Sequence, residues 1–385
     1  RAVLTDGFAA AAYHTANPEA ACLAIAPPYP DRAPFTDASL VGLGGGLAEQ
    51  AITFKYALTM TQSMVQAWHE CISSELERVE AVMNDVTRSD NPQLLEMCQY
   101  VLSNHGKRIR PAITILSYYS CGGRDAKRAI DVGAAIELIH NATLIHDDIN
   151  DQGEVRRGAK ALYKEYSLGK SIVAGDYMFA LGFRLIGSAA PAIVDYIVEA
   201  ASAMGTGEFS QKRYERNVAV GEPQYMNIIS GKTARLIECA AKCGAYLAAS
   251  DEMEIVDRVG EFAFRTGQAF QIVDDVLDVI GYEDNTGKKP GNDILEGKPT
   301  LPTIYAIEDP QVGPRVREVF EDPHATSADA AEAIALIAKT DAAARCLDKA
   351  KVLVEDAVPL LEPLPASEYK DSLIELARFI AARDR

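Results

Sequence analysis

Apolar residues recur every three or four positions along most of the chain, starting near residue 61. This spacing places them on one face of a helix. In the first such segment they are Met64, Val65, Trp68, Ile72, Leu76, Val79, Val82 and Val86. The same pattern predicts further helices over residues 126–149, 171–186, 191–204, 224–249, 252–280, 327–361 and 367–383. No alternating β-branched run and no strand-bounded turn occurs, so we predict an all-α domain without strands.

The first 62 residues have a different texture. Five of the 18 prolines lie between Pro18 and Pro34, and the run GLGGG follows at residues 42–46. The segment has neither the basic and apolar order of a signal peptide nor the arginine content of a transit peptide. We predict a weakly ordered extension over residues 1–62 and one all-α domain over residues 63–385.

Composition narrows the function classes. The formal net charge of −17 argues against nucleic acid or an anionic membrane as a partner. The seven cysteines are odd in number and form no CxxC pair, which is typical of buried thiols in a reducing cytoplasm. No apolar run reaches the length of a transmembrane helix. An anionic substrate would therefore need a local basic pocket.

Two clusters of aspartates with identical spacing each end a predicted apolar helix. The members are Asp147, Asp148 and Asp151, and then Asp274, Asp275 and Asp278. Carboxylates repel one another, and a helix C-terminus already presents negative charge, so each cluster needs a cation. Mg²⁺ fits, because it takes one or two carboxylates and shares its other positions with water and substrate phosphates.

Basic residues supply the complementary charge. They are Lys107, Arg108 and Arg110 in NHGKRIRP, Arg156 and Arg157 after the first cluster, Lys232 in GKTARL, and Lys288 and Lys298 in TGKKPGNDILEGKPTLP. Arginine grips phosphate oxygens in pairs and lysine acts as a point charge. The pattern predicts a site for two polyanions, one bridged to the aspartates by Mg²⁺ and one held directly by basic side chains. No P-loop, nucleophile elbow or HExxH motif occurs.

Six motifs in this order resemble the trans-isoprenyl diphosphate synthases, or polyprenyl synthetases. They are HGKRIRP, LIHDDIND with RRG, VAGDYM, GKTARL, FQIVDDVLD and GKKPGNDILEGKPTLP, and the likeness covers residues 65–385. His105 stands where the family has a glycine. The resemblance implies antiparallel helices around a central cavity, a homodimer and three Mg²⁺ ions per site. It also implies a prenyltransferase that condenses an allylic diphosphate with isopentenyl diphosphate, head to tail.

The resemblance also assigns roles to individual residues. The six aspartates would hold Mg²⁺ and the allylic diphosphate, helped by Arg156, Lys232, Lys288 and Lys298. Isopentenyl diphosphate would be bound by Lys107, Arg110, His140 and Arg157. Thr233 and Gln271 would turn oxygen dipoles toward the developing carbocation. The catalytic set is therefore Asp147, Asp148, Asp151, Lys232, Thr233, Gln271 and Asp274.

Two small residues bear on product length. Ala142 and Thr143 lie about one turn before Asp147, where bulky aromatic residues stop chain growth early in the resembling family. A helical turn rises about 5.4 Å, close to one isoprene unit, so open turns permit further additions. We predict an all-trans product of geranylgeranyl length or longer, with Met178, Phe179 or Phe183 as candidate floors.

Three alternatives remain open at this point. A class I terpene cyclase also ionises a diphosphate with an aspartate-rich motif, but it has no need for HGKRIRP. An HD-type metal phosphohydrolase would use His146 and Asp147, but it would leave the second cluster without a role. An inactive subunit of a heteromeric synthase would be expected to lack some of the aspartates.

Overall fold

The computed structural model describes residues 68–104, 106–280 and 291–382. The predicted extension, His105 and Lys288 lie outside these residues. The described helices are α2 (Ser73–Val86), α3 (Pro92–Ser103), α4 (Ile109–Ser120), α5 (Lys127–Asn150), α6 (Leu162–Glu165), α7 (Leu168–Ile186), α8 (Pro191–Arg213), α9 (Glu222–Ile229), α10 (Arg235–Ala249), α11 (Met253–Ile280), α13 (Asn292–Glu296), α14 (Leu301–Ile307), α15 (Gly313–Glu321), α16 (Ser327–Ile337), α17 (Ala342–Glu355) and α18 (Glu368–Ala382). The all-α class is confirmed.

One detail of that prediction is wrong, because a small hairpin interrupts the helices. Strands β1 (Val155–Arg156) and β2 (Ala159–Lys160) pair antiparallel, with Arg156 opposite Ala159. The turn between them has positive φ at both central residues, 52° at Arg157 and 78° at Gly158. Glycine adopts this conformation freely, but arginine rarely does. The turn has Arg-Gly in place of the usual Asn-Gly or Asp-Gly, so the sequence carries no hairpin signal.

Three helix predictions also differ in extent. The segment 224–249 is α9 and α10 joined by a π-helix, η2 (Ser230–Ala234). The segment 327–361 is divided into α16, α17 and the short 3₁₀-helix η3 (Val358–Leu361). Helix α8 runs nine residues beyond the predicted end at Met204, because Gly205 and Gly207 are tolerated inside it. Glycine lowers helix propensity by only about 1 kcal/mol, which packing can override.

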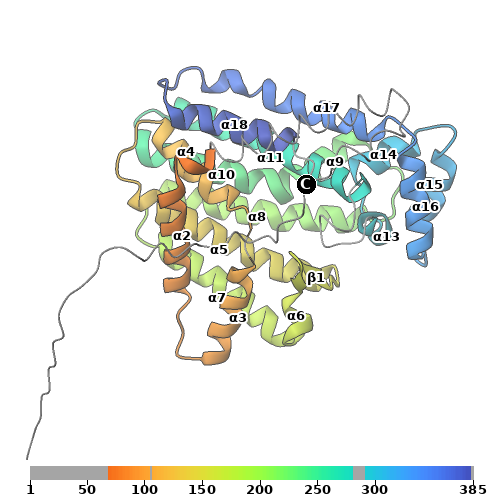
Figure 1. Ribbon diagram of the computed structural model, residues 1–385, viewed down its shortest axis with the longest axis horizontal. Helices are drawn as coiled ribbons and strands as arrows, with labels where there is room; N and C mark the ends of the chain where they lie inside the picture. Colours follow the sequence, from red (N-terminus) through yellow and green to blue (C-terminus); the bar gives the residue numbers. More distant parts are fainter. Residues whose placement is uncertain (1–67, 105, 281–290, 383–385) are drawn as a thin grey trace, which may run out of the picture. The chain divides into compact units, whose positions relative to one another are not determined.

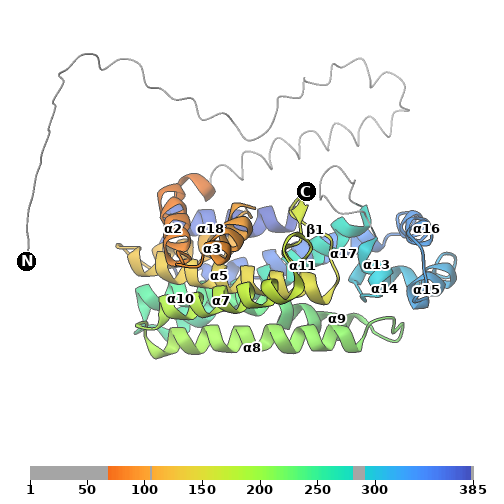
Figure 2. The same ribbon diagram turned by 90° about the horizontal axis from the view of Figure 1, so that it is seen from below.

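Helix α5 is the core of the described domain. It is buried on all sides along most of its length, as expected for a helix without a polar face. It packs against α2, α4, α7 and α10, and α11 packs against α10, α17 and α18. Helix α8 runs along one edge of the helices in Figure 2. The aspartates therefore lie at the C-terminal ends of two helices, α5 and α11, whose other buried residues are mostly apolar.

Some helix pairs approach so closely that only glycine fits between them. A Cβ atom on Gly244 of α10 would lie 2.1 Å from the carbonyl oxygen of Thr114 in α4. A Cβ atom on Gly207 of α8 would lie 2.5 Å from the backbone nitrogen of Lys232 in η2. The second contact holds the π-helix against the last turns of α8, where the candidate site lies.

Candidate active site

The first aspartate cluster occupies the C-terminal end of α5, and its neighbours neutralise it unequally. Asp148 is buried and accepts hydrogen bonds from the guanidinium of Arg156, which the β-hairpin folds back toward α5 (Nε to Oδ1, 2.8 Å). Burial alone would lower the pKa of Arg156. The hydrogen bonds and the charge of Asp148 outweigh burial, so the pKa of Arg156 lies above its usual value. The hairpin thus places one predicted phosphate-binding arginine directly beside a predicted metal ligand.

Asp151 lies between two lysines. Lys298 donates to Oδ2 at 2.8 Å, and the Nζ of Lys212 lies 3.3 Å from Oδ1. Burial would raise the pKa of Asp151, but Lys298, Lys232 and Lys212 lower it below its usual value. Each flanking lysine has a second acidic partner, Glu215 for Lys212 and Glu296 for Lys298. The result is a chain of five alternating charges, Glu215–Lys212–Asp151–Lys298–Glu296, which we call the ion-pair chain.

Asp147 has the least compensated charge of the three. Burial raises its pKa to about 6, Lys232 counteracts this, and Glu208 and Asp151 add to it. Glu208, on α8, forms an ion pair with Lys232 at 2.7 Å and accepts a hydrogen bond from Asn150. A carboxylate with a raised pKa beside other carboxylates is a site where an added cation would be stabilised.

The π-helix η2 presents two of the predicted residues. Lys232 contacts Glu208 and donates to the Oε1 of Gln211 at 3.3 Å. Thr233 donates its hydroxyl hydrogen to the Oε1 of Gln271 at 2.6 Å. Single-turn π segments inside helices are frequently found at functional sites.

The second cluster ends α11, and its three carboxylates differ in environment. Asp274 is exposed and Asp278 is half-buried, whereas Asp275 is buried. Asp275 accepts hydrogen bonds from Tyr225 at 2.7 Å and Gln271 at 2.8 Å. Burial, followed by Asp293, raises its pKa to about 8 despite those bonds. Both oxygens of Asp275 thus have protein partners.

A continuous set of contacts connects the two clusters. The backbone nitrogen of Asp293, at the start of α13, donates to the Oδ2 of Asp278 at 3.3 Å. The backbone nitrogen of Lys298 donates to the carbonyl of Asp293 at 2.8 Å, and the Lys298 side chain reaches Asp151. The two aspartate clusters, 127 residues apart in sequence, are therefore connected through α13 and the turn that follows it.

A second group of basic residues lies at the start of α4 and in the hairpin turn. Burial lowers the pKa of His140, and Arg110 and Arg157 lower it further, so the imidazole is neutral. Burial also lowers the pKa of Arg110 to about 10; Glu137 opposes this shift, and Arg157 adds to it. Arg108, Arg110 and Arg157 outnumber Glu137, the carboxylate that acts on all three. An excess of cationic groups over carboxylates is typical of an anion site.

Lys107 and Arg108, in the same segment, have different surroundings. The Nζ of Lys107 lies 5.4 Å from the centre of the Phe379 ring, in a cation–π contact with α18. Arg108 is buried, pairs with Glu80 and Glu137 and donates to the Leu102 carbonyl. The structure therefore separates Arg108 from the basic residues that could meet a ligand.

Sequence reasoning missed three residues here: Glu208, Gln211 and Lys212, all in the last turns of α8. Glu208 and Gln211 are three residues apart, so they lie on one helical face, and Lys212 is the next residue. That spacing of an acid and an amide near a helix end was the available signal. It was hidden because the helix was predicted to end at Met204.

The donor set fits a hard divalent ion, although the carboxylates have other partners in this conformation. Among residues 68–104, 106–280 and 291–382, no three His, Cys, Asp or Glu side chains converge into a ready metal site. Asp148 is paired with arginine and Asp151 with lysines, so both would have to exchange partners. Carboxylate oxygens are the ligands that Mg²⁺ prefers. The assignment of the six aspartates as ligands stays a prediction.

The residues predicted to set product length lie on the inner part of α5. Ala142 is fully buried, and the hydroxyl of Thr143 donates to the His140 carbonyl at 2.8 Å. Across from this stretch, Met178 of α7 is fully buried, whereas Phe179 and Phe183 are partly exposed with their rings 5.3 Å apart. Of the three candidate floors, Met178 is thus the most deeply buried.

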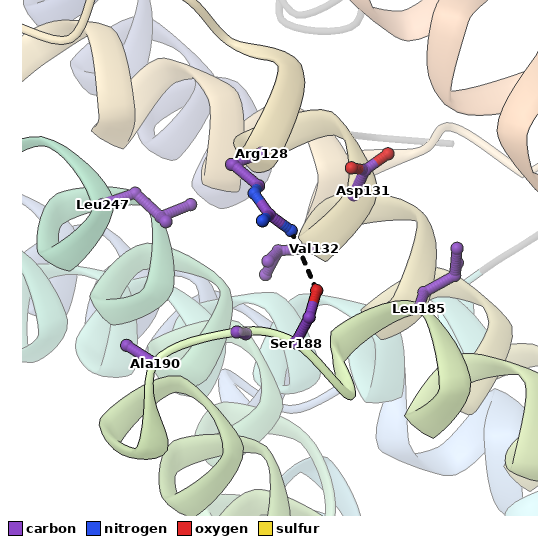
Figure 3. Close-up of a pocket in the computed structure, with 8 residues that line it drawn as sticks. Arg128, Asp131, Val132, Leu185, Ser188, Ala190 and Leu247 are labelled. Carbon is purple, nitrogen blue, oxygen red and sulfur yellow. Dashed lines mark hydrogen bonds between the residues drawn. The ribbon is translucent and has the colours of Figure 1, made fainter.

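A pocket of about 200 Å³ lies at the opposite end of α5 and is distinct from this site. Figure 3 shows its lining, with the Arg128 guanidinium joined to the Ser188 hydroxyl by a 3.2 Å hydrogen bond. Val132, in its wall, precedes Asp147 by 15 residues, or about 22 Å of helix. The pocket is too far from the aspartates to belong to the acidic site.

The helices and the charged residues at the ends of α5 and α11 are those of an all-α enzyme class. The sequence profile described as "Polyprenyl synthetase" matches residues 91–337, and the chain belongs to that family. Members are prenyltransferases of isoprenoid biosynthesis and depend on a metal ion.

Individual relatives support the same assignment. The octaprenyl diphosphate synthase of Haemophilus influenzae is 32% identical over 306 residues, which cover 79% of this chain and 92% of the relative. Heptaprenyl diphosphate synthase component 2 of Geobacillus stearothermophilus is 33% identical over 321 residues, which cover 83% and 99%. A crystal structure of polyprenyl synthase from Caulobacter crescentus CB15, complexed with calcium and isoprenyl diphosphate, superposes with a TM-score of 0.80 at 28% identity. It covers 83% of this chain and 98% of that one.

The comparisons do not support a terpene cyclase or an HD-type phosphohydrolase. None of the described helices combines the length and apolarity needed to span a bilayer.

Proposed function

We propose that this chain condenses an allylic diphosphate with isopentenyl diphosphate, head to tail, and releases an all-trans polyprenyl diphosphate of geranylgeranyl length or longer. The supporting observation is the contact path from Asp151 through Lys298 and Asp293 to Asp278, with a separate basic group at Arg110 and Arg157. Two anion sites of different character suit two diphosphate substrates.

The allylic diphosphate would bind between the two acidic clusters. Arg156, Lys232 and Lys298 would exchange their present carboxylate partners for phosphate oxygens, with Lys288 as a further ligand outside the described residues. Bound Mg²⁺, which we expect as three ions held by the six aspartates, would neutralise the charge that develops on the departing diphosphate. The protein supplies positioned charge here rather than a nucleophile.

Thr233 and Gln271 would face the positive charge left on the allylic carbon. The Gln271 amide nitrogen donates to Asp275 and its oxygen accepts from Thr233, so the orientation of the amide is fixed. The Thr233 hydroxyl gives its hydrogen to Gln271 and keeps its lone pairs available to the cation. Asp275 would thus contribute by positioning Gln271.

Isopentenyl diphosphate would bind to Lys107, Arg110, His140 and Arg157. A Cβ atom on Gly106 would lie 2.7 Å from the Arg157 guanidinium, so the glycine lets that guanidinium lie against the loop. His140 is neutral and can share a hydrogen bond without adding charge. After bond formation, the released diphosphate would accept the proton lost from the isopentenyl unit.

We further propose a cytoplasmic homodimer. Helices α7 and α8 expose Leu168, Ile172, Val173, Val198 and Phe209, which is 83% exposed. Val198 and Phe209 are 11 residues apart, which is three helical turns, so they share a face of α8. Exposed apolar side chains that share a helix face, as Val198 and Phe209 do, would suit a protein interface. One relative is named component 2 of a heptaprenyl diphosphate synthase, so a different subunit is the alternative partner.

The test is a condensation assay with the purified chain alone. Isopentenyl diphosphate, a series of allylic primers and Mg²⁺ should give elongated products, which chromatography would size. Asp147→Asn and Asp148→Asn should each lower turnover by at least about a hundredfold, since each removes charge from the ionising site. Phosphate release without elongation would favour a hydrolase, and activity only with an added subunit would favour a heteromer.

A further inference from the structure

Arg216 lies three residues beyond the end of α8 and has an unusual conformation and unusual partners. Its φ is +56°, in the left-handed region that arginine seldom adopts. Its guanidinium donates to three main-chain carbonyls, those of Leu295, Phe320 and Asp322 (Nη1 to Asp322, 2.7 Å). A guanidinium whose side-chain hydrogen bonds among the described residues all go to main-chain carbonyls holds those backbone segments together, and we call this set of contacts the Arg216 clamp.

The accepting carbonyls lie at the C-terminal ends of two helices. Leu295 belongs to the last turn of α13, Phe320 belongs to the last turn of α15, and Asp322 is the residue that follows α15. Terminal carbonyls lack intrahelical partners and carry the negative end of the helix dipole, so a cation between them is favoured. Figure 1 shows α13 and α15 at the same end of the helices, and α13 packs against α15. Arg216 thus ties both helix ends to the loop after α8.

Gly297 completes the contact. Its carbonyl accepts a hydrogen bond from the Arg216 backbone nitrogen at 2.8 Å, and its φ is +73°. A Cβ atom at this position would lie 2.4 Å from the Cγ of Arg216. Only glycine fits, so both the conformation and the close approach are specific to this residue.

The clamped turn carries Lys298, the residue after Gly297. Lys298 is the link from α13 to Asp151 in the ion-pair chain. We infer that Arg216 is a positioning residue, which fixes the Leu295–Lys298 turn so that the Lys298 ammonium reaches the diphosphate site beside Asp151. This inference rests on the proposed function, because it assumes that Lys298 takes part in diphosphate binding.

The test is a double-mutant cycle read by binding rather than by turnover. Inorganic pyrophosphate would be titrated calorimetrically, in excess Mg²⁺, into wild type, Arg216→Met, Lys298→Met and the double variant. Each single substitution should weaken the affinity about tenfold, and the double variant should stay within about twofold of Lys298→Met, because both act through one ammonium group. Arg216→Lys keeps the charge but loses the fork, so it should recover only part of the affinity.

Two further variants keep the test decisive. Gly297→Ala disturbs the same clamp from the other side and should also have no added effect in the Lys298→Met background. Arg315→Met is the matched control, since Arg315 lies on α15 and its partners are the carboxylates of Glu318, Asp329 and Glu332. It should retain wild-type pyrophosphate affinity.

Additive losses in the double variant, or unchanged affinity in a folded Arg216→Met, would overturn the inference. Its failure is separable from failure of the proposed function. Wild type that condenses substrates while the cycle is additive refutes the clamp alone. A wild-type protein that never elongates a primer refutes the proposed function, and with it the role of Lys298 on which the inference rests.

Discussion

Arg108 and Arg110 are two residues apart, yet they have opposite surroundings. Arg108 is 7% exposed and pairs with Glu137, which is 2% exposed, and with Glu80. Arg110 has no ion pair of this kind among the described residues; burial lowers its pKa, Glu137 opposes the shift and the charge of Arg157 adds to it. Sequence identifies both as basic, but only packing against α2 and α5 decides which of them is structural.

Removal of the Arg108 charge should destabilise the fold. Arg108→Met leaves Glu137 buried without its partner and should cost about 3 kcal/mol of unfolding free energy, measured by urea denaturation. Adding Glu137→Gln should recover part of this loss, because the unpaired buried charge is gone. Arg88→Met is the control, since Arg88 and Asp85 form an exposed pair and should contribute little. Equal losses for Arg88→Met and Arg108→Met would contradict the argument.

Ala142 allows a direct test of product length. Ala142→Phe adds a ring one turn before the aspartates and should shorten the product, as judged by chromatography. Thr143→Ala, at the adjacent position, removes volume and should not shorten it. An unchanged product length in an active, folded Ala142→Phe would refute the assignment of this wall.

At the scale of helices, local pattern predicted the long elements better than their interruptions. Helices α5, α7, α11 and α18 lie within a few residues of their predicted bounds, because each has sustained helical periodicity. The π-helix at Ser230–Ala234 could not be predicted, since it depends on the approach of α8 at Gly207. Likewise Glu208 and Lys212 join the site through packing of α8, which no local pattern encodes.

Because α4 and α10 approach so closely, the cost of a glycine-to-alanine substitution should depend strongly on which glycine is replaced. Gly244→Ala should force the helices apart and cost about 2 kcal/mol, because the nearest atoms are backbone and cannot rotate away. Gly169→Ala, in the first turn of α7, meets nothing within 4 Å and should leave stability unchanged or slightly higher. Thermal melts of the two variants should therefore differ, and matching melts would contradict the packing argument.

At the scale of the whole molecule, the exposed faces of α7 and α8 predict the oligomeric state. Val198→Lys with Phe209→Lys should convert a dimer to a monomer in light scattering, because like charges would face each other across the interface. Val352→Lys is the control, since Val352 is exposed on α17, on a different helix. Persistence of the dimer in the Val198→Lys, Phe209→Lys variant would place the interface elsewhere.

The ion-pair chain has a consequence for how the protein is handled. Lys212 and Lys298 already neutralise Asp151, so the fold has no need of a divalent ion at that carboxylate. Chelation with EDTA should therefore abolish turnover yet leave the melting temperature almost unchanged, and a large drop would contradict this. In a Lys212→Met, Lys298→Met variant, added Mg²⁺ should instead raise the melting temperature. The enzyme would then begin each cycle with an exchange of counterions, giving up its own ammonium groups as the substrate arrives.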